Sequence, residues 1–146
     1  MARKGREYTL VPDVIIHAYN WSVESRPIFL RQVDGDVFLE FIRHALGRFP
    51  VSLLVYTLLP GRFDLILHQH EPYAVASFMK YVEEEFACWI NKQLSRNGPV
   101  FSGRYRGNII PDEKELLRVS RDIHMGPVSA GLASSPDEWN LSSCRG

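Results

Sequence analysis

The chain has 146 residues, of which 45% are hydrophobic and 23% charged, a profile typical of one globular domain with a sizeable core. Its 17 Lys and Arg residues balance 17 Asp and Glu residues, so global charge indicates no particular partner. The sequence has no apolar run long enough for a membrane span and no apolar signal core near its start. We therefore expect a cytoplasmic protein without a membrane partner. With only Cys88 and Cys144, a four-cysteine zinc site is excluded and a structural disulfide is not expected.

The first half of the chain predicts a strand, a helix and a hairpin. Residues 13–19 are rich in β-branched and aromatic types, which favour a strand. The apolar spacing over 36–47 predicts a helix with one apolar stripe. Strands are predicted at 51–58 and 62–68, and the Leu-Pro-Gly turn at 59–61 indicates that they pair as an antiparallel hairpin.

The second half predicts two more helices. The helical period persists over 73–94, and a glycine-rich loop and strand segment follows at 100–110. A last helix is predicted at 113–125, where Gly126 and Pro127 should end it.

This order of elements favours an α+β fold over a doubly wound parallel sheet. We expect a ferredoxin-like antiparallel sheet with the helices packed on one face. The expected organisation is one domain at 7–133, followed by a C-terminal tail at 134–146 that forms a surface turn with Trp139 as its anchor.

Several segments, in the same order and at the same separations, match the motifs of one known family. Residues 59–65 read LPGRFDL where that family has MPNHxHL, and residues 26–29 read RPIF where it has QPIF. Residues 98–105 read GPVFSGRY for GHLFQGRY, and residues 121–132 read RDIHMGPVSAGL for RYIHLNPVRAGL. The chain therefore resembles the HUH single-strand transposases, particularly the REP-associated tyrosine transposases. The resemblance implies an α+β fold, hairpin or single-stranded DNA as partner, and a homodimer.

The positions that carry the family's chemistry are changed in this chain. In the family, two histidines on one strand face hold a divalent metal and a helix tyrosine attacks the scissile phosphate. Here those positions are Arg62, Asp64 and Asp122, and a further polar position one helical turn later is Gly126. A guanidinium has no lone pair for a metal, and Asp122 has no phenolic oxygen. The resemblance thus implies a site with no catalytic residues and no metal cofactor, so we expect an inactive homologue.

Arg62 and Asp64 share one strand face, and the fold should place Asp122 opposite them. One interpretation is a salt-bridge cluster that fills the former metal pocket. The alternative is a new Mg²⁺ or Mn²⁺ site on Asp64 and Asp122, which the positive charge of Arg62 opposes. His68 lies on the same face, but roughly 13 Å from Asp64 along the strand, so the two cannot share an ion.

The other histidines and the tryptophans have structural interpretations. His17 is expected to be a satisfied core or interface histidine, His68 and His70 a polar pair at a strand end, and His124 to face away from Asp122. The three tryptophans are expected to be core or interface anchors: Trp21, Trp89 and Trp139.

Local charge differs from global charge in one segment. No acidic residue occurs from Phe86 to Pro111, whereas cations and aromatic residues alternate there. Cations neutralise phosphates and rings stack on bases, so this pattern is typical of a single-strand or hairpin binder. The residues expected to bind nucleic acid are Lys92, Arg96, Arg104, Tyr105 and Arg106, and Arg3, Lys4 and Arg6 add positive charge near the start.

Three functions remain open from the sequence. The leading hypothesis is a transposase-like DNA-binding domain that has lost catalysis. The second is a protein-interaction or regulatory module without DNA binding. The third is a metal-dependent nuclease that uses Asp64 and Asp122.

Overall fold

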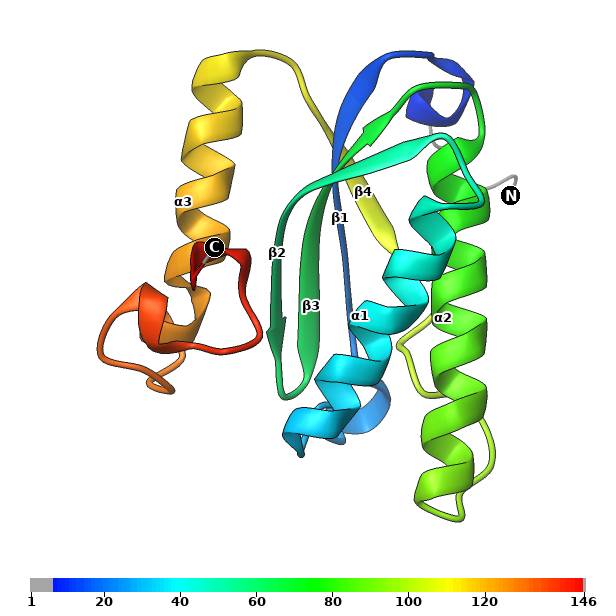
Figure 1. The fold of residues 1–146 in the computed structure, drawn as a ribbon, viewed down its shortest axis with the longest axis vertical. Coiled ribbons are helices and arrows are strands. Elements are labelled where there is room, and N and C mark those ends of the chain that lie inside the picture. The colour runs from blue at the N-terminus through cyan, green and yellow to red at the C-terminus, as the bar shows by residue number, and fades with distance from the viewer. Residues whose placement is uncertain (1–6, 146) are drawn as a thin grey trace.

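Four strands form one antiparallel sheet in a computed structural model that describes residues 7–145 (Figure 1). The strands are β1 (Val14–Trp21), β2 (Val51–Leu59), β3 (Arg62–Gln69) and β4 (Arg106–Ile110), and their order across the sheet is β2-β3-β1-β4. The helices are α1 (Gln32–Leu46), α2 (Ala74–Gln93) and α3 (Glu113–Ser129). The predicted α+β class with an antiparallel, ferredoxin-like sheet is confirmed.

The helices lie on both faces of the sheet, as Figure 1 shows. On one face, α1 and α2 cover the larger core, in which the rings of Phe29, Phe38, Phe63 and Phe86 contact one another. On the opposite face, α3 packs on a smaller apolar cluster that includes Val55, Ile66, Ile110, Val119 and Ile123. The expectation that the helices share one face therefore holds for α1 and α2, whereas α3 covers the other face because its apolar stripe meets outward-facing apolar residues of β2, β3 and β4.

Two helix ends differ from the sequence-based expectation. The first helix begins at Gln32, not 36, because the backbone N–H of Arg31 donates to the Asp34 carboxylate at 2.9 Å and the two residues cap the helix start. The last helix runs through Pro127 to Ser129, so the expectation that Gly126 and Pro127 end it is wrong. A proline in the last turn removes one N–H but leaves the following hydrogen bonds intact, and Ala130 N–H still donates to Gly126 O at 2.9 Å.

The segment expected to form a tail packs against the sheet. Leu141 is buried in the larger core, and Ser142 forms a bridge with Thr57 of β2. The indole N–H of Trp139 donates to Leu58 O at 2.7 Å, so this tryptophan does anchor the segment. None of the helices in the described part of the chain is both long and apolar enough to cross a membrane.

Side chains of β1 alternate between the two faces of the sheet, and this alternation determines which residues lie on each face. Ile16 and Ala18 point into the larger core, so the odd-numbered residues of the strand point to the α3 face. The register places Trp21 beside Arg62 and Tyr19 beside Asp64 on β3, and Tyr19 beside Arg106 on β4. Polar and aromatic side chains thus gather at one end of the face on which α3 lies.

Candidate functional site

The α3 face of the sheet has an apolar end and a polar end. At the apolar end, Ile66 and Ile110 are buried beneath α3. At the other end, Trp21 remains 38% exposed and the Arg62 side chain 39% exposed, so α3 does not cover them. We refer to the side chains of Tyr19, Trp21, Arg62, Asp64 and Arg106 as the polar end of the sheet.

Asp64 is the centre of an ion cluster at this end. Arg62 donates to both of its oxygens, with Nε 2.8 Å from Oδ2 and Nη2 2.8 Å from Oδ1. His17 Nε2 lies 2.8 Å from the same Oδ1. Burial alone would raise the pKa of Asp64, but the hydrogen bonds from Arg62 and His17 outweigh burial and lower it. The carboxylate therefore stays ionised, and the same pairing raises the pKa of the Arg62 guanidinium.

The three changed catalytic positions line one pocket of about 320 Å³. Arg62 and Asp64 reach it from β3, and Asp122 and Gly126 from α3. Asp122 lies on the opposite wall from the cluster, but it is not part of it: its carboxylate accepts from Arg118 at 3.0 Å and is 65% exposed. Asp122 thus lies across the pocket from Arg62 and Asp64, as the sequence predicted. The ion pairs form separately: Arg62 pairs with Asp64 on one wall, and Arg118 pairs with Asp122 on the other.

A divalent metal does not fit this pocket. Both carboxylate oxygens of Asp64 are already engaged by Arg62, and His17 shares one of them. An ion beside Asp64 would also lie next to a permanent cation, which opposes it electrostatically. The residues present therefore supply no metal-activated step here, and a nuclease built on Asp64 and Asp122 has no support from the geometry.

The aromatic residues of β1 form a continuous row. Ring centroids of His17 and Tyr19 lie 4.8 Å apart, and those of Tyr19 and Trp21 6.3 Å apart. Two cations cover this row: the Arg62 guanidinium lies 4.8 Å from the Tyr19 ring, and the Arg106 guanidinium lies 3.9 Å from the Trp21 ring. Two guanidinium groups thus lie against a row of rings of which Trp21 is exposed, an arrangement that can take up a stacked base and a phosphate.

Arg106 is held from the inner side of the sheet. Its Nη1 donates to Asn20 Oδ1 at 2.6 Å and to Ser102 O at 2.7 Å. Asn20 is fully buried and donates in turn to Glu83 on α2 at 2.7 Å. The acceptors of Arg106 are neutral, and among residues 7–145 it has no ion-pair partner, so its charge remains available to an anion.

The other residues predicted to bind nucleic acid have different surroundings. Lys92 and Arg104 are exposed and Arg96 is half-buried. Tyr105 is only 5% exposed and belongs to the larger core, as does Phe101. The burial of Tyr105 argues against the expected stacking role, because its ring lies in the core whereas Arg104 is exposed and Arg106 half-buried.

Sequence reasoning missed the aromatic row of β1. Trp21 was expected to be an anchor, and His17 to be a satisfied core or interface histidine. His17 does have a partner, but that partner is Asp64, 47 residues away. The available signal was the alternation His17, Tyr19, Trp21 at every second position of a strand, which places all three side chains on one face.

Solved structures share this fold, although no protein-family model and no curated protein matches the chain. A REP-associated tyrosine transposase bound to a REP hairpin matches with a TM-score of 0.83 at 14% identity, over 99% of this chain and 84% of that one. A protein from Deinococcus radiodurans described as a candidate transposase matches with a TM-score of 0.56 at 17% identity, over 84% of this chain and 95% of that one. The chain therefore shares the fold of these two transposase structures, in agreement with the fold that its motifs predicted.

Proposed function

We propose that this chain is a transposase-like DNA-binding protein that binds hairpin or single-stranded DNA without cleaving it. The observation that carries the proposal is the ion cluster of Arg62, Asp64 and His17 in the pocket where its sequence motifs place the transposase chemistry. The solved structure that shares its fold over 99% of the chain is itself bound to a DNA hairpin. A chain that keeps this fold but has other residues at the positions of the family's chemistry is expected to bind DNA without cleaving it.

The absence of cleavage follows from what phosphodiester cleavage needs. The reaction that the resemblance implies uses a tyrosine as the nucleophile and a metal ion as the Lewis acid. Asp122 offers a carboxylate paired with Arg118, and Arg62 offers a cation paired with Asp64. Asp122 therefore has no phenolic oxygen, and Arg62 has no lone pair with which to hold a metal.

The proposed binding surface is the polar end of the sheet together with the cations around β4. Trp21 supplies the accessible ring, and Arg106 beside it has no ion-pair partner among residues 7–145. Arg104 adds an exposed charge two residues earlier. Lys92 and Arg96 extend the positive charge along the chain. We also propose that the protein forms a homodimer, as the resemblance implies. The expected cytoplasmic location agrees with a DNA-binding role.

A titration with a short fluorescent DNA hairpin tests the proposal, with anisotropy read at two salt concentrations. If three or four cations each neutralise about one phosphate, the slope of log K against log salt should be about −2 to −3. Replacing Arg104 and Arg106 by Glu should then weaken binding to all hairpins about equally.

The matched control is Arg48→Glu, which reverses a cation next to the start of β2, at the opposite end of the sheet from Arg62. This variant should bind as the unmodified protein does. Folded protein that shows no hairpin binding at low salt would reject the DNA function and favour the protein-interaction module instead.

A further inference from the structure

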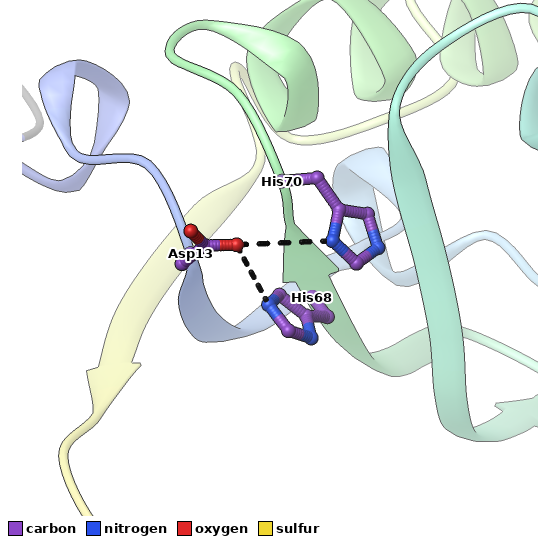
Figure 2. Close-up of side chains that lie close together, drawn as sticks. All are labelled: Asp13, His68 and His70. Carbon is purple, nitrogen blue, oxygen red and sulfur yellow. Dashed lines mark ion pairs between the residues drawn. The ribbon is translucent and has the colours of Figure 1, made fainter.

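Two histidines and an aspartate lie close together, as Figure 2 shows. The strand register places them at the end of the sheet opposite the ion cluster. Asp13 immediately precedes β1, His68 lies near the end of β3, and His70 follows the strand. One ligand atom from each residue lies within 4.8 Å of the others. Asp13 Oδ1 is 3.7 Å from His68 Nε2 and 4.0 Å from His70 Nδ1.

The strand geometry explains how the two rings face the same carboxylate. His68 and His70 are two residues apart, so their side chains leave the same side of the chain, and their ring centroids lie 4.2 Å apart. Asp13 has a φ of 52°, in the left-handed region that aspartate tolerates better than most residues. This backbone turn occurs immediately before the strand that pairs with His68.

His68 Nε2 is buried and has no hydrogen-bond partner. A distance of 3.7 Å to Asp13 Oδ1 is too long for a hydrogen bond. Buried ring nitrogens are normally satisfied, so an unsatisfied one that faces a second imidazole and a carboxylate requires an explanation.

His70 has the supporting contact that a metal-binding histidine usually has. Its Nε2 lies 2.7 Å from Ser52 Oγ on β2. If that nitrogen carries the proton and donates to the hydroxyl, the lone pair is on Nδ1, which is the atom that faces Asp13.

We propose that Asp13, His68 and His70 form a binding site for a divalent transition metal of the Zn²⁺ class. Two imidazoles and one carboxylate are ligands that Zn²⁺ accepts, and water would complete the coordination. With bonds of about 2.0–2.1 Å, ligand atoms in a tetrahedral site lie about 3.4 Å apart. The three groups must therefore move inward by on the order of 1 Å, which the Asp13 side chain, at 78% exposure, has room to do.

This site is separate from the proposed DNA surface and goes beyond that function. His68 is four residues from Asp64 along β3, or roughly 13 Å, so an ion here cannot reach the pocket of Arg62 and Asp64. The ion would instead link the start of β1 to the end of β3, two strands in the middle of the sheet. Its expected effect is therefore on stability.

Calorimetric titration of the full chain with Zn²⁺ tests the proposal, together with thermal unfolding at increasing Zn²⁺. We expect one ion per chain and a melting temperature that rises by several degrees at a large excess of metal over Kd. Co²⁺ should give the visible d–d absorption of a nitrogen and oxygen site without thiolate charge transfer. A Cys88→Ser background excludes binding by that exposed thiol.

Variants identify the ligands. His68→Gln, His70→Gln and Asp13→Asn should each weaken Zn²⁺ binding at least 10-fold, and Ser52→Ala should weaken it by about 10-fold through His70. His44→Gln, an exposed histidine on α1, is the matched control and should bind as before. Asparagine tolerates the backbone of Asp13, so that variant tests the site even if a histidine variant fails to fold.

Two results would overturn the proposal. One is a folded protein that shows no saturable Zn²⁺ binding. The other is Zn²⁺ binding that all three ligand variants retain at full strength. Either result would leave only the contacts of Asp13 with the two imidazoles as the role of the cluster.

Discussion

The Arg62 guanidinium meets the Asp64 carboxylate edge to edge, with two parallel hydrogen bonds of 2.8 Å each. This bidentate geometry uses the planar fork of arginine, which lysine could not reproduce. Asp64 is 8% exposed, whereas the Arg62 side chain is 39% exposed, so the pair joins a buried carboxylate to a partly exposed cation. An ion pair in this position engages both of the carboxylate oxygens that a metal ion would need.

The first prediction concerns cleavage. Purified protein incubated with hairpin DNA and Mg²⁺ or Mn²⁺ should produce neither a nicked strand nor a covalent adduct, because the pocket holds neither a metal site nor a nucleophile. A denaturing gel with labelled DNA measures both products. An adduct that survives denaturation would contradict the prediction, and Tyr81→Phe and Tyr105→Phe would then identify the attacking tyrosine.

The second prediction concerns the ion pair and stability. Arg62→Met leaves a largely buried carboxylate without its main partner. Breaking a fully buried pair costs about 3–5 kcal/mol, and the 39% exposure of Arg62 reduces the expected cost to about 1–3 kcal/mol. Urea unfolding measures the change. Arg43→Met, which breaks an exposed pair with Glu40, is the control and should change stability by less than about 1 kcal/mol.

The same ion pair extends the second prediction to the pH dependence of stability, through Asp64. Burial acts to raise its pKa, but hydrogen bonds from Arg62 and His17 lower it overall. The unfolded state therefore binds this proton more tightly, so the ionised carboxylate stabilises the fold above about pH 4, and the effect is lost as pH falls through the lower folded pKa.

Comparing the unmodified protein with Asp64→Asn by urea unfolding between about pH 6 and pH 2 measures this contribution. The stability difference should shrink as the solution becomes more acidic. A difference that stays constant over that range would show that Asp64 does not contribute through ionisation.

Much of the fold could be predicted because it depends on local periodicity. The helical spacing located α2 to within a residue at each end, and the Leu-Pro-Gly turn located the β2-β3 hairpin. The face on which α3 lies could not be predicted, since an apolar stripe such as Val119 and Ile123 specifies that a helix packs but not on which side of a sheet.

The site was only partly predictable for a similar reason. The pairing of Arg62 with Asp64 follows from strand alternation within β3. The contact of Asp64 with His17 depends on the β1-β3 register, which joins residues 47 positions apart. The burial of Tyr105 depends on the whole core around it, and composition made it look like an accessible aromatic residue.

The third prediction concerns the C-terminal segment. Leu141 is 6% exposed within the larger core, whereas Leu132 is 42% exposed. Leu141→Ala should cost about 2–4 kcal/mol of unfolding free energy, and Leu132→Ala should cost less than about 1 kcal/mol. Urea unfolding measures both variants. If Leu141→Ala and Leu132→Ala lost the same unfolding free energy, Leu141 would not contribute to the core, and its segment would behave as an independent tail.

The fourth prediction separates the two candidate stacking residues. Trp21 is exposed beside Arg106, so Trp21→Ala should weaken hairpin binding by about 1–3 kcal/mol with little loss of stability. Tyr105→Ala should instead lower the unfolding free energy, because its ring is buried. Tyr73→Asn removes an exposed ring just before α2, near the end of β3 farther from Trp21, and keeps a residue that tolerates its φ of 65°.

Anisotropy with the same hairpin compares the three variants, and urea unfolding confirms that each is folded. Binding should fall for Trp21→Ala and stay unchanged for Tyr73→Asn. If Tyr73→Asn weakens binding and Trp21→Ala does not, the DNA contacts the opposite end of the molecule. If neither does, bases do not stack on the β1 row, and any binding that remains depends on the cations Arg104 and Arg106 and should lose its affinity steeply with salt.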